Sequence, residues 1–66
     1  MNRIQAMQLL SDGCKLTHST FTSEEWVKGV GDGMLRFEDG IECHSDSFWI
    51  LRNSDGFDKG WHVLTK

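Results

Sequence analysis

Two glycine turn signals in the middle of the sequence constrain the fold more than any other feature. They are the segments GDG at 31–33 and EDG at 38–40, and each can supply the positive φ that tight hairpins require. We therefore predict three strands, at about Trp26–Val30, Met34–Phe37 and Ile41–His44, joined as an antiparallel meander.

The N-terminal segment has apolar residues at helical spacing. Ile4, Met7 and Leu10, with Ala6 and Leu9 beside them, form one stripe along the segment. The opposite face is polar. This pattern predicts a helix that lies on an apolar surface.

Capping signals stand at both ends of this helix. Asn2 can accept hydrogen bonds from the amides of the first turn, and Gly13 can take the left-handed conformation that ends a helix. After Gly13 the apolar period changes to two, with Cys14, Leu16 and His18 on one side. This alternation predicts a strand.

The remaining segments are expected to complete the sheet. "FWILR" at 48–52 and "WHVLT" at 61–65 are predicted strands, separated by a polar loop. The segment Thr22–Lys28 fits either one helical turn or a loop that leads into a strand. Gly29, inside a strand pattern, predicts a bulge or a close approach of another backbone.

The predicted fold is a single α+β domain over residues 1–66. The N-terminal helix covers one face of a strongly bent antiparallel sheet of five to six short strands, because a flat sheet would leave half of its apolar residues in water. A chain of 66 residues buries only about 60% of the surface that its unfolded form exposes. Self-association is therefore expected to add to its stability.

Charge and targeting signals limit the classes of partner. The net charge is -3 and the bases form no stripe, so DNA or RNA binding is not expected. No apolar run approaches the roughly 20 residues that span a bilayer. Without a recognisable targeting segment, we expect a cytoplasmic protein with no membrane partner. In that compartment Cys14 and Cys43 are more often free thiols than a disulfide.

Residues of catalytic or metal-binding type form no recognisable motif. Cys14, His18, Cys43, His44 and His62 are of the types that bind zinc, but they lack C-x-x-C or H-x-x-x-H spacing. A Cys–His nucleophile also needs an orienting third residue and oxyanion donors, which the sequence does not indicate. We therefore predict no enzyme activity, no metal and no cofactor.

The aromatic residues carry the most information about function. Each ring buries about 150–250 Å², so one small fold is not expected to enclose all of them. Phe48 and Trp49 are neighbours on a predicted strand and therefore face opposite sides. One of the two is expected to reach the surface and meet another copy or a planar ligand. The rings are Phe21, Trp26, Phe37, Phe48, Trp49, Phe57 and Trp61.

The order of these features resembles a known family. An "I-x-A-M-x-L-L-x-x-G" helix, a strand beginning "C-K-L-T-H" and a closing "F-D-x-G-W-H-V-L" resemble the small phage proteins of the Thoeris anti-defence sponge family, over Ile4 to Lys15 and Asp58 to Leu64. This resemblance implies a non-enzymatic homo-oligomer that captures a cyclic nucleotide-derived immune signal in pockets between subunits. The location would be the host cytoplasm if the chain is phage-encoded.

Five residues are predicted to bind this ligand. Trp61 and Asp58 are nearest to the family positions, and Trp49, Arg52 and Lys15 are added from their chemistry. An indole stacks on a purine, and a guanidinium or ammonium binds phosphate. A second hypothesis is a protein–protein inhibitor module that docks on a host enzyme through exposed aromatics and an acidic rim. A third is a purely structural subunit.

Overall fold

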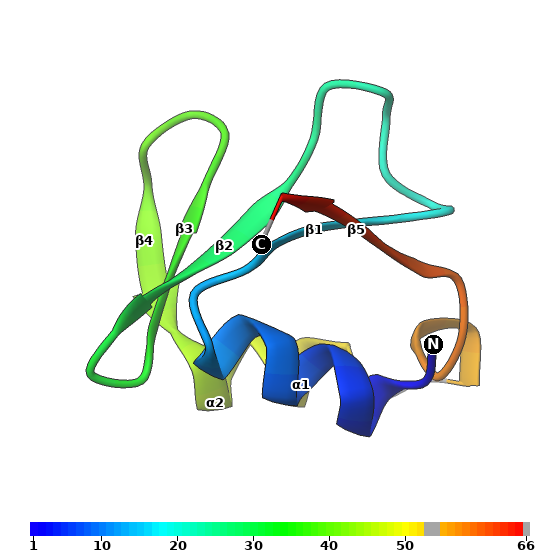
Figure 1. The fold of residues 1–66 in the computed structure, drawn as a ribbon, viewed down its shortest axis with the longest axis horizontal. Coiled ribbons are helices and arrows are strands. Elements are labelled where there is room, and N and C mark those ends of the chain that lie inside the picture. Colours follow the sequence, from blue (N-terminus) through cyan, green and yellow to red (C-terminus); the bar gives the residue numbers. More distant parts are fainter. Residues whose placement is uncertain (53–54, 66) are drawn as a thin grey trace.

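The protein has two layers, an antiparallel sheet and two helices on one side of it (Figure 1). The computed structural model describes residues 1–52 and 55–65. The open sheet has the strand order β4-β3-β2-β1-β5, so the predicted α+β fold, with an N-terminal helix and five strands, is confirmed. The elements in chain order are α1 (Arg3–Ser11), β1 (Lys15–His18), β2 (Val27–Gly31), β3 (Met34–Phe37), β4 (Glu42–His44), α2 (Ser45–Leu51), the 3-10 turn η1 (Asp55–Phe57) and β5 (Trp61–Thr65).

Helix α1 begins and ends where its caps were predicted. The Asn2 side chain accepts a hydrogen bond from the Gln5 amide at 2.8 Å, and the Gln5 side chain accepts one from the Asn2 amide at 3.0 Å. Together they form a capping box. At the other end Gly13 has φ 88, the left-handed conformation that ends a helix.

Only part of the predicted apolar stripe on α1 is buried. Ala6 and Leu10 pack into the core and Leu9 is partly buried against it. Ile4 and Met7 remain 72% and 43% exposed, so the prediction that they lie on an apolar surface is wrong. The sheet covers only a narrow band of α1, centred on Ala6 and Leu10. Ile4 and Met7 fall beside that band.

The meander of β2, β3 and β4 is confirmed, with antiparallel pairing throughout. Its first turn contains three consecutive residues with positive φ, Gly31, Asp32 and Gly33, and its second contains Gly40. The register between β2 and β3 shifts between Gly29 and Gly31. This shift confirms the bulge predicted at Gly29.

The segment Thr22–Lys28 is not helical. Residues 23–24 form a turn, and β2 begins at Val27. In β1, which precedes this segment, Leu16 and His18 are buried, as is Cys14 just before the strand. The strand predicted from the alternation of these residues is confirmed, and it pairs with both β2 and β5.

The segment at 48–52 was predicted to be a strand, and this prediction is wrong. It falls largely within helix α2, where Phe48 is 1% and Trp49 is 8% exposed. Successive residues on a helix are only about 100° apart, so both rings can face the sheet. The expectation that one of them reaches the surface is therefore wrong as well. Asp46 lies in the first turn of α2, where a negative charge stabilises a helix.

The core is an aromatic cluster centred on Trp61. The Trp61 ring centroid lies 4.7 Å from that of His18 and 5.2 Å from that of Trp49. Its indole Nε1 donates a hydrogen bond to the Phe57 carbonyl at 2.8 Å. Aliphatic residues fill the rest of the space between the helices and the sheet. The buried apolar residues are Ala6, Leu10, Cys14, Leu16, Val27, Leu35, Phe48, Trp49 and Trp61.

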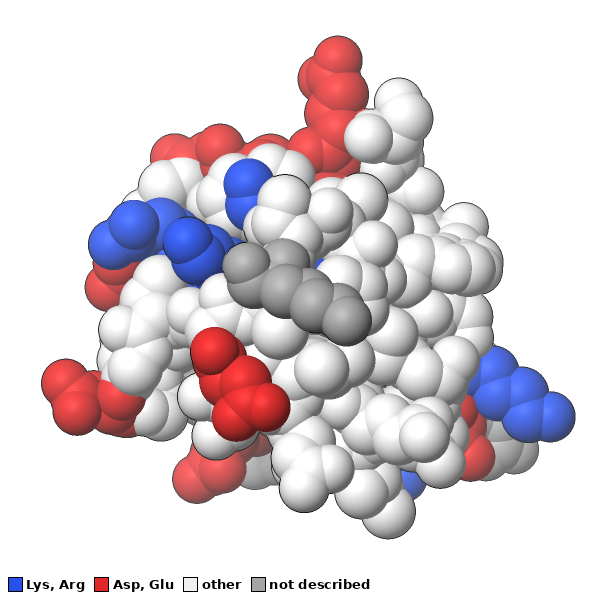
Figure 2. Space-filling model, viewed as in Figure 1, with Lys and Arg blue, Asp and Glu red and all other residues white. Residues whose placement is uncertain are grey.

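Both cysteines are free thiols, Cys14 buried and Cys43 partly buried. Charged side chains lie mostly at the margin of the face shown in Figure 2, where acidic and basic residues are mixed. Across residues 1–52 and 55–65, neither helix has the length and apolar character needed to cross a membrane.

Candidate functional site

A hollow of about 320 Å³ opens between the loop before β2, the β3–β4 turn and the end of α2. We call it the aromatic pocket. Its volume reaches the lower end of the range for small-ligand sites, about 300–1,000 Å³. It combines aromatic rings, three carboxylates and one guanidinium. The lining residues are Phe21, Glu25, Trp26, Phe37, Glu38, Asp39, Ile41 and Arg52.

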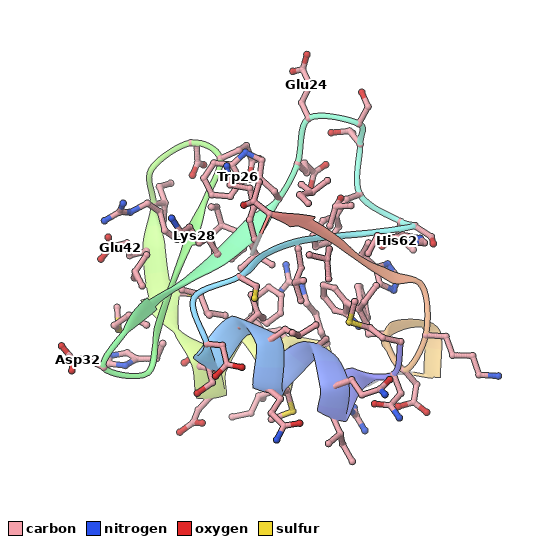
Figure 3. All side chains as sticks on the ribbon, in the orientation of Figure 1. Glu24, Trp26, Lys28, Asp32, Glu42 and His62 are labelled. Atoms are coloured by element: carbon pink, nitrogen blue, oxygen red, sulfur yellow. The ribbon has the colours of Figure 1, made fainter. Side chains whose placement is uncertain are left out.

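Trp26 forms one wall of the aromatic pocket (Figure 3). The loop that carries it is held by two hydrogen bonds. The Thr17 hydroxyl donates to the Glu25 carbonyl at 2.9 Å, and the Thr22 amide donates to the Glu25 carboxylate at 3.2 Å. The Lys15 Nζ lies 4.2 Å from the centroid of the Trp26 ring. This cation–π contact shows that the Trp26 ring can hold a cation over its face.

Arg52 reaches the pocket from the end of α2. Its guanidinium carbon lies 4.2 Å from the Phe48 ring centroid and 5.9 Å from that of Phe57. Its Nη1 also donates a long hydrogen bond, 3.5 Å, to the Phe48 carbonyl. Stacking on these rings therefore holds Arg52, the only cation among the described residues that line this pocket.

The lining carries more negative than positive charge. Among the described lining residues, Glu25, Glu38 and Asp39 are acidic and Arg52 is basic, which gives a net charge of -2 when all four are ionised. The Asp39 carboxylate accepts a hydrogen bond from the Ile41 amide at 3.0 Å, which fixes it in the turn. Aromatic faces next to carboxylates bind ammonium and guanidinium groups, whereas the same carboxylates repel phosphate.

The five residues predicted to bind a ligand do not meet in one place. Trp61 and Trp49 are core residues, so neither offers a free ring face on which a base could stack. Asp58 is exposed in the loop before β5. Arg52 lines the aromatic pocket, and Lys15 reaches it only through its contact with the Trp26 ring.

Trp26 was not among the predicted site residues, although the sequence contained a signal for it. Val27 pairs with Phe37 across β2 and β3. This register places Trp26, just before β2, near Glu38, just after β3. Both the meander and its second turn were predicted, so aligning the two strands would have revealed the tryptophan beside the acidic turn.

His18 has a structural role. Its Nε2 lies 2.6 Å from the Lys59 carbonyl, and its Nδ1 accepts a hydrogen bond from the Thr20 amide at 3.1 Å. The neutral tautomer with hydrogen on Nε2 satisfies both contacts. Among the described residues, no group of three or more His, Cys, Asp or Glu is placed to hold a metal ion.

Comparisons with protein-family models, curated protein sequences and solved structures give no match to this chain. The resemblance to the Thoeris anti-defence family therefore stays a prediction.

Proposed function

We propose that this protein is a non-catalytic binding module that holds a positively charged side chain of a partner protein in the aromatic pocket. The observation that carries the proposal is the joining of Trp26, Phe21 and Phe37 with three carboxylates in one hollow. It corresponds to the predicted module that docks through exposed aromatics and an acidic rim.

The physical basis is the combined attraction of rings and carboxylates for a cation. A cation over an indole face contributes about 0.5–2 kcal/mol, more as the site loses water. A guanidinium also forms paired hydrogen bonds with a carboxylate, which fix its orientation. Arginine is for these reasons common among the residues that dominate protein interfaces. An arginine of the partner is therefore the favoured occupant.

Capture of a nucleotide is the second candidate function. It is favoured by Lys15 against one face of Trp26 and by Arg52 in the same pocket, since a base can stack on an indole while cations bind its phosphates. The three lining carboxylates weigh against it. An anionic ligand would have to approach Glu25, Glu38 and Asp39 at close range.

Titration with two probes separates the candidates. The first probe is a short peptide with one arginine between glycine and serine residues, and its control has citrulline, which is neutral, at the same position. The second probe is a cyclic adenine dinucleotide. The readout is the Trp26 indole N–H signal by NMR, assigned with Trp26→Phe. We expect the arginine peptide alone to shift this signal. A shift with the dinucleotide alone would contradict this proposal and support nucleotide capture instead.

A matched pair of acidic variants tests whether the pocket itself attracts the cation. Glu38 lines the pocket, whereas Glu24 points away from the molecule into solvent (Figure 3). Glu38→Gln and Glu24→Gln remove the same charge. We expect Glu38→Gln to weaken peptide binding by about threefold, equivalent to about 0.6 kcal/mol, and Glu24→Gln to leave it unchanged. Equal effects would mean that only the overall charge attracts the peptide, and the proposal would fail.

A further inference from the structure

We infer that the outer side of the two helices is the interface of a symmetric dimer of this chain. Three aliphatic side chains stand out there. Ile50 on α2 is 75% exposed, and on α1 Ile4 and Met7 are the exposed members of the predicted stripe. Trp49 lies between the helices. We call these four residues the helical face.

A hollow of about 530 Å³ lies in the helical face. Met7 borders it from α1, Ile50 borders it from α2, and Trp49 lies between them. Its rim carries one residue of each charge, Arg3 and Asp46. Apolar walls of this kind favour an apolar side chain as the occupant.

A second copy of the same surface is the occupant that we infer for the helical face. It contains both a hollow and the projecting side chains of Ile4 and Ile50. A two-fold axis places each projection of one copy opposite the hollow of the other, and each such contact occurs twice.

The small size of the chain favours a dimer in which the helical face is permanently buried. A standard interface takes about 800 Å² from each partner, which is under a fifth of the accessible surface of 4394 Å². Small domains generally need a disulfide, a metal or self-association. Both thiols here are free. Self-association is thus the source of stability that the helical face can supply, and it gives the predicted homo-oligomer an interface.

Leu51 provides a matched control on the same helix. It is 80% exposed, yet it does not border the hollow. On α2 it lies about 100° around the helix axis from Ile50, on the flank away from the hollow. A glutamate at either position adds the same charge to the same helix. Only at Ile50 would that charge be buried in the dimer.

The test is the mass in solution, measured by light scattering and sedimentation at about 100 μM, where a dimer with a micromolar Kd is populated. We expect the unaltered chain to have twice the 7.6 kDa of one copy. Ile50→Glu and, on α1, Met7→Glu should both be monomers with unchanged circular dichroism, whereas Leu51→Glu should stay dimeric. The inference is overturned if the unaltered chain is a monomer, or if Ile50→Glu and Leu51→Glu behave alike.

This inference is independent of the aromatic pocket, because the two linings share no residue. Peptide binding measured on the monomeric Met7→Glu variant therefore tests the proposed function separately. Retained binding in a monomer would support the pocket alone. Lost binding would show that the pocket depends on the dimer.

Discussion

The backbone of Gly29 in β2 lies directly against the carbonyl group of Leu10 at the end of α1. A Cβ at position 29 would be 1.6 Å from the Leu10 oxygen and 2.6 Å from its carbonyl carbon. Both of these atoms belong to the backbone, so no side chain can move aside. The close approach expected from the glycine in the strand is therefore present, and it sets how closely α1 packs on the sheet.

Gly29→Ala should be strongly destabilising for this reason. The extra methyl must push α1 away from β2, and overpacking of this kind costs about 1–3 kcal/mol or more. Gly40→Ala is the comparison, because Gly40 has open space around it but φ 86, which costs an alanine about 1–2 kcal/mol. Urea unfolding followed by circular dichroism gives both values. A smaller loss for Gly29→Ala than for Gly40→Ala would contradict the packing argument.

The two core tryptophans should respond differently to phenylalanine. Trp61→Phe loses the hydrogen bond from Nε1 to the Phe57 carbonyl, at a cost of about 1–3 kcal/mol. Trp49 Nε1 is buried and has no hydrogen-bond partner among residues 1–52 and 55–65. Trp49→Phe therefore costs only the packing that is lost with the smaller ring, about 1 kcal/mol. Unfolding midpoints of the two variants would decide this, and equal losses would argue against the difference in hydrogen bonding.

His18→Ala should cost far more than a change at an exposed histidine. His18 is buried between rings, including Phe57 at 4.8 Å, and it joins β1 to the loop before β5. We expect a loss of about 3 kcal/mol from the cavity and the broken hydrogen bonds. His62 on β5 is exposed, and His62→Ala should change stability by less than about 0.5 kcal/mol. Thermal unfolding is the measurement, and equal unfolding temperatures for the two variants would contradict this expectation.

Cys43 should react more slowly with iodoacetamide than an ordinary thiol. Burial raises the pKa of the Cys43 thiol above its ordinary value of 9.0, and the positive charge of Arg52 partly opposes this. Less thiolate is then present at pH 8, and the thiolate is the reactive form. Mass spectrometry of the alkylated site gives the rate, with the urea-unfolded chain as reference. Arg52→Gln should slow the reaction further, because the opposing charge is gone.

The same shift gives a sign for the effect of pH on stability. The pKa of Cys43 is higher in the folded than in the unfolded chain, so its contribution is complete below pH 9.0 and is lost as the pH rises through the folded value. Stability should therefore fall faster above pH 9 in the unaltered chain than in Cys43→Ser. Parallel curves for the two proteins would show that another group is responsible.

Local patterns were enough to predict most of the fold. The caps at Asn2 and Gly13, the alternation in β1 and the two glycine turns depend on residues close together in sequence. Apart from the segment at 48–52, each predicted element formed at nearly the predicted residues. The error at 48–52 arose because bulky apolar residues favour a strand locally, while packing two adjacent rings on one core requires a helix.

The sequence by itself determined the helix, the meander and the closing strand, because hydrogen bonding and steric limits act over a few residues. Only the tertiary structure decided which rings stay accessible, since burial depends on contacts between distant segments. It enclosed Trp49 and Trp61, and it brought Trp26, Glu38 and Arg52 around one hollow. The candidate site therefore follows from the packing of the sheet against α2, which no single stretch of sequence encodes.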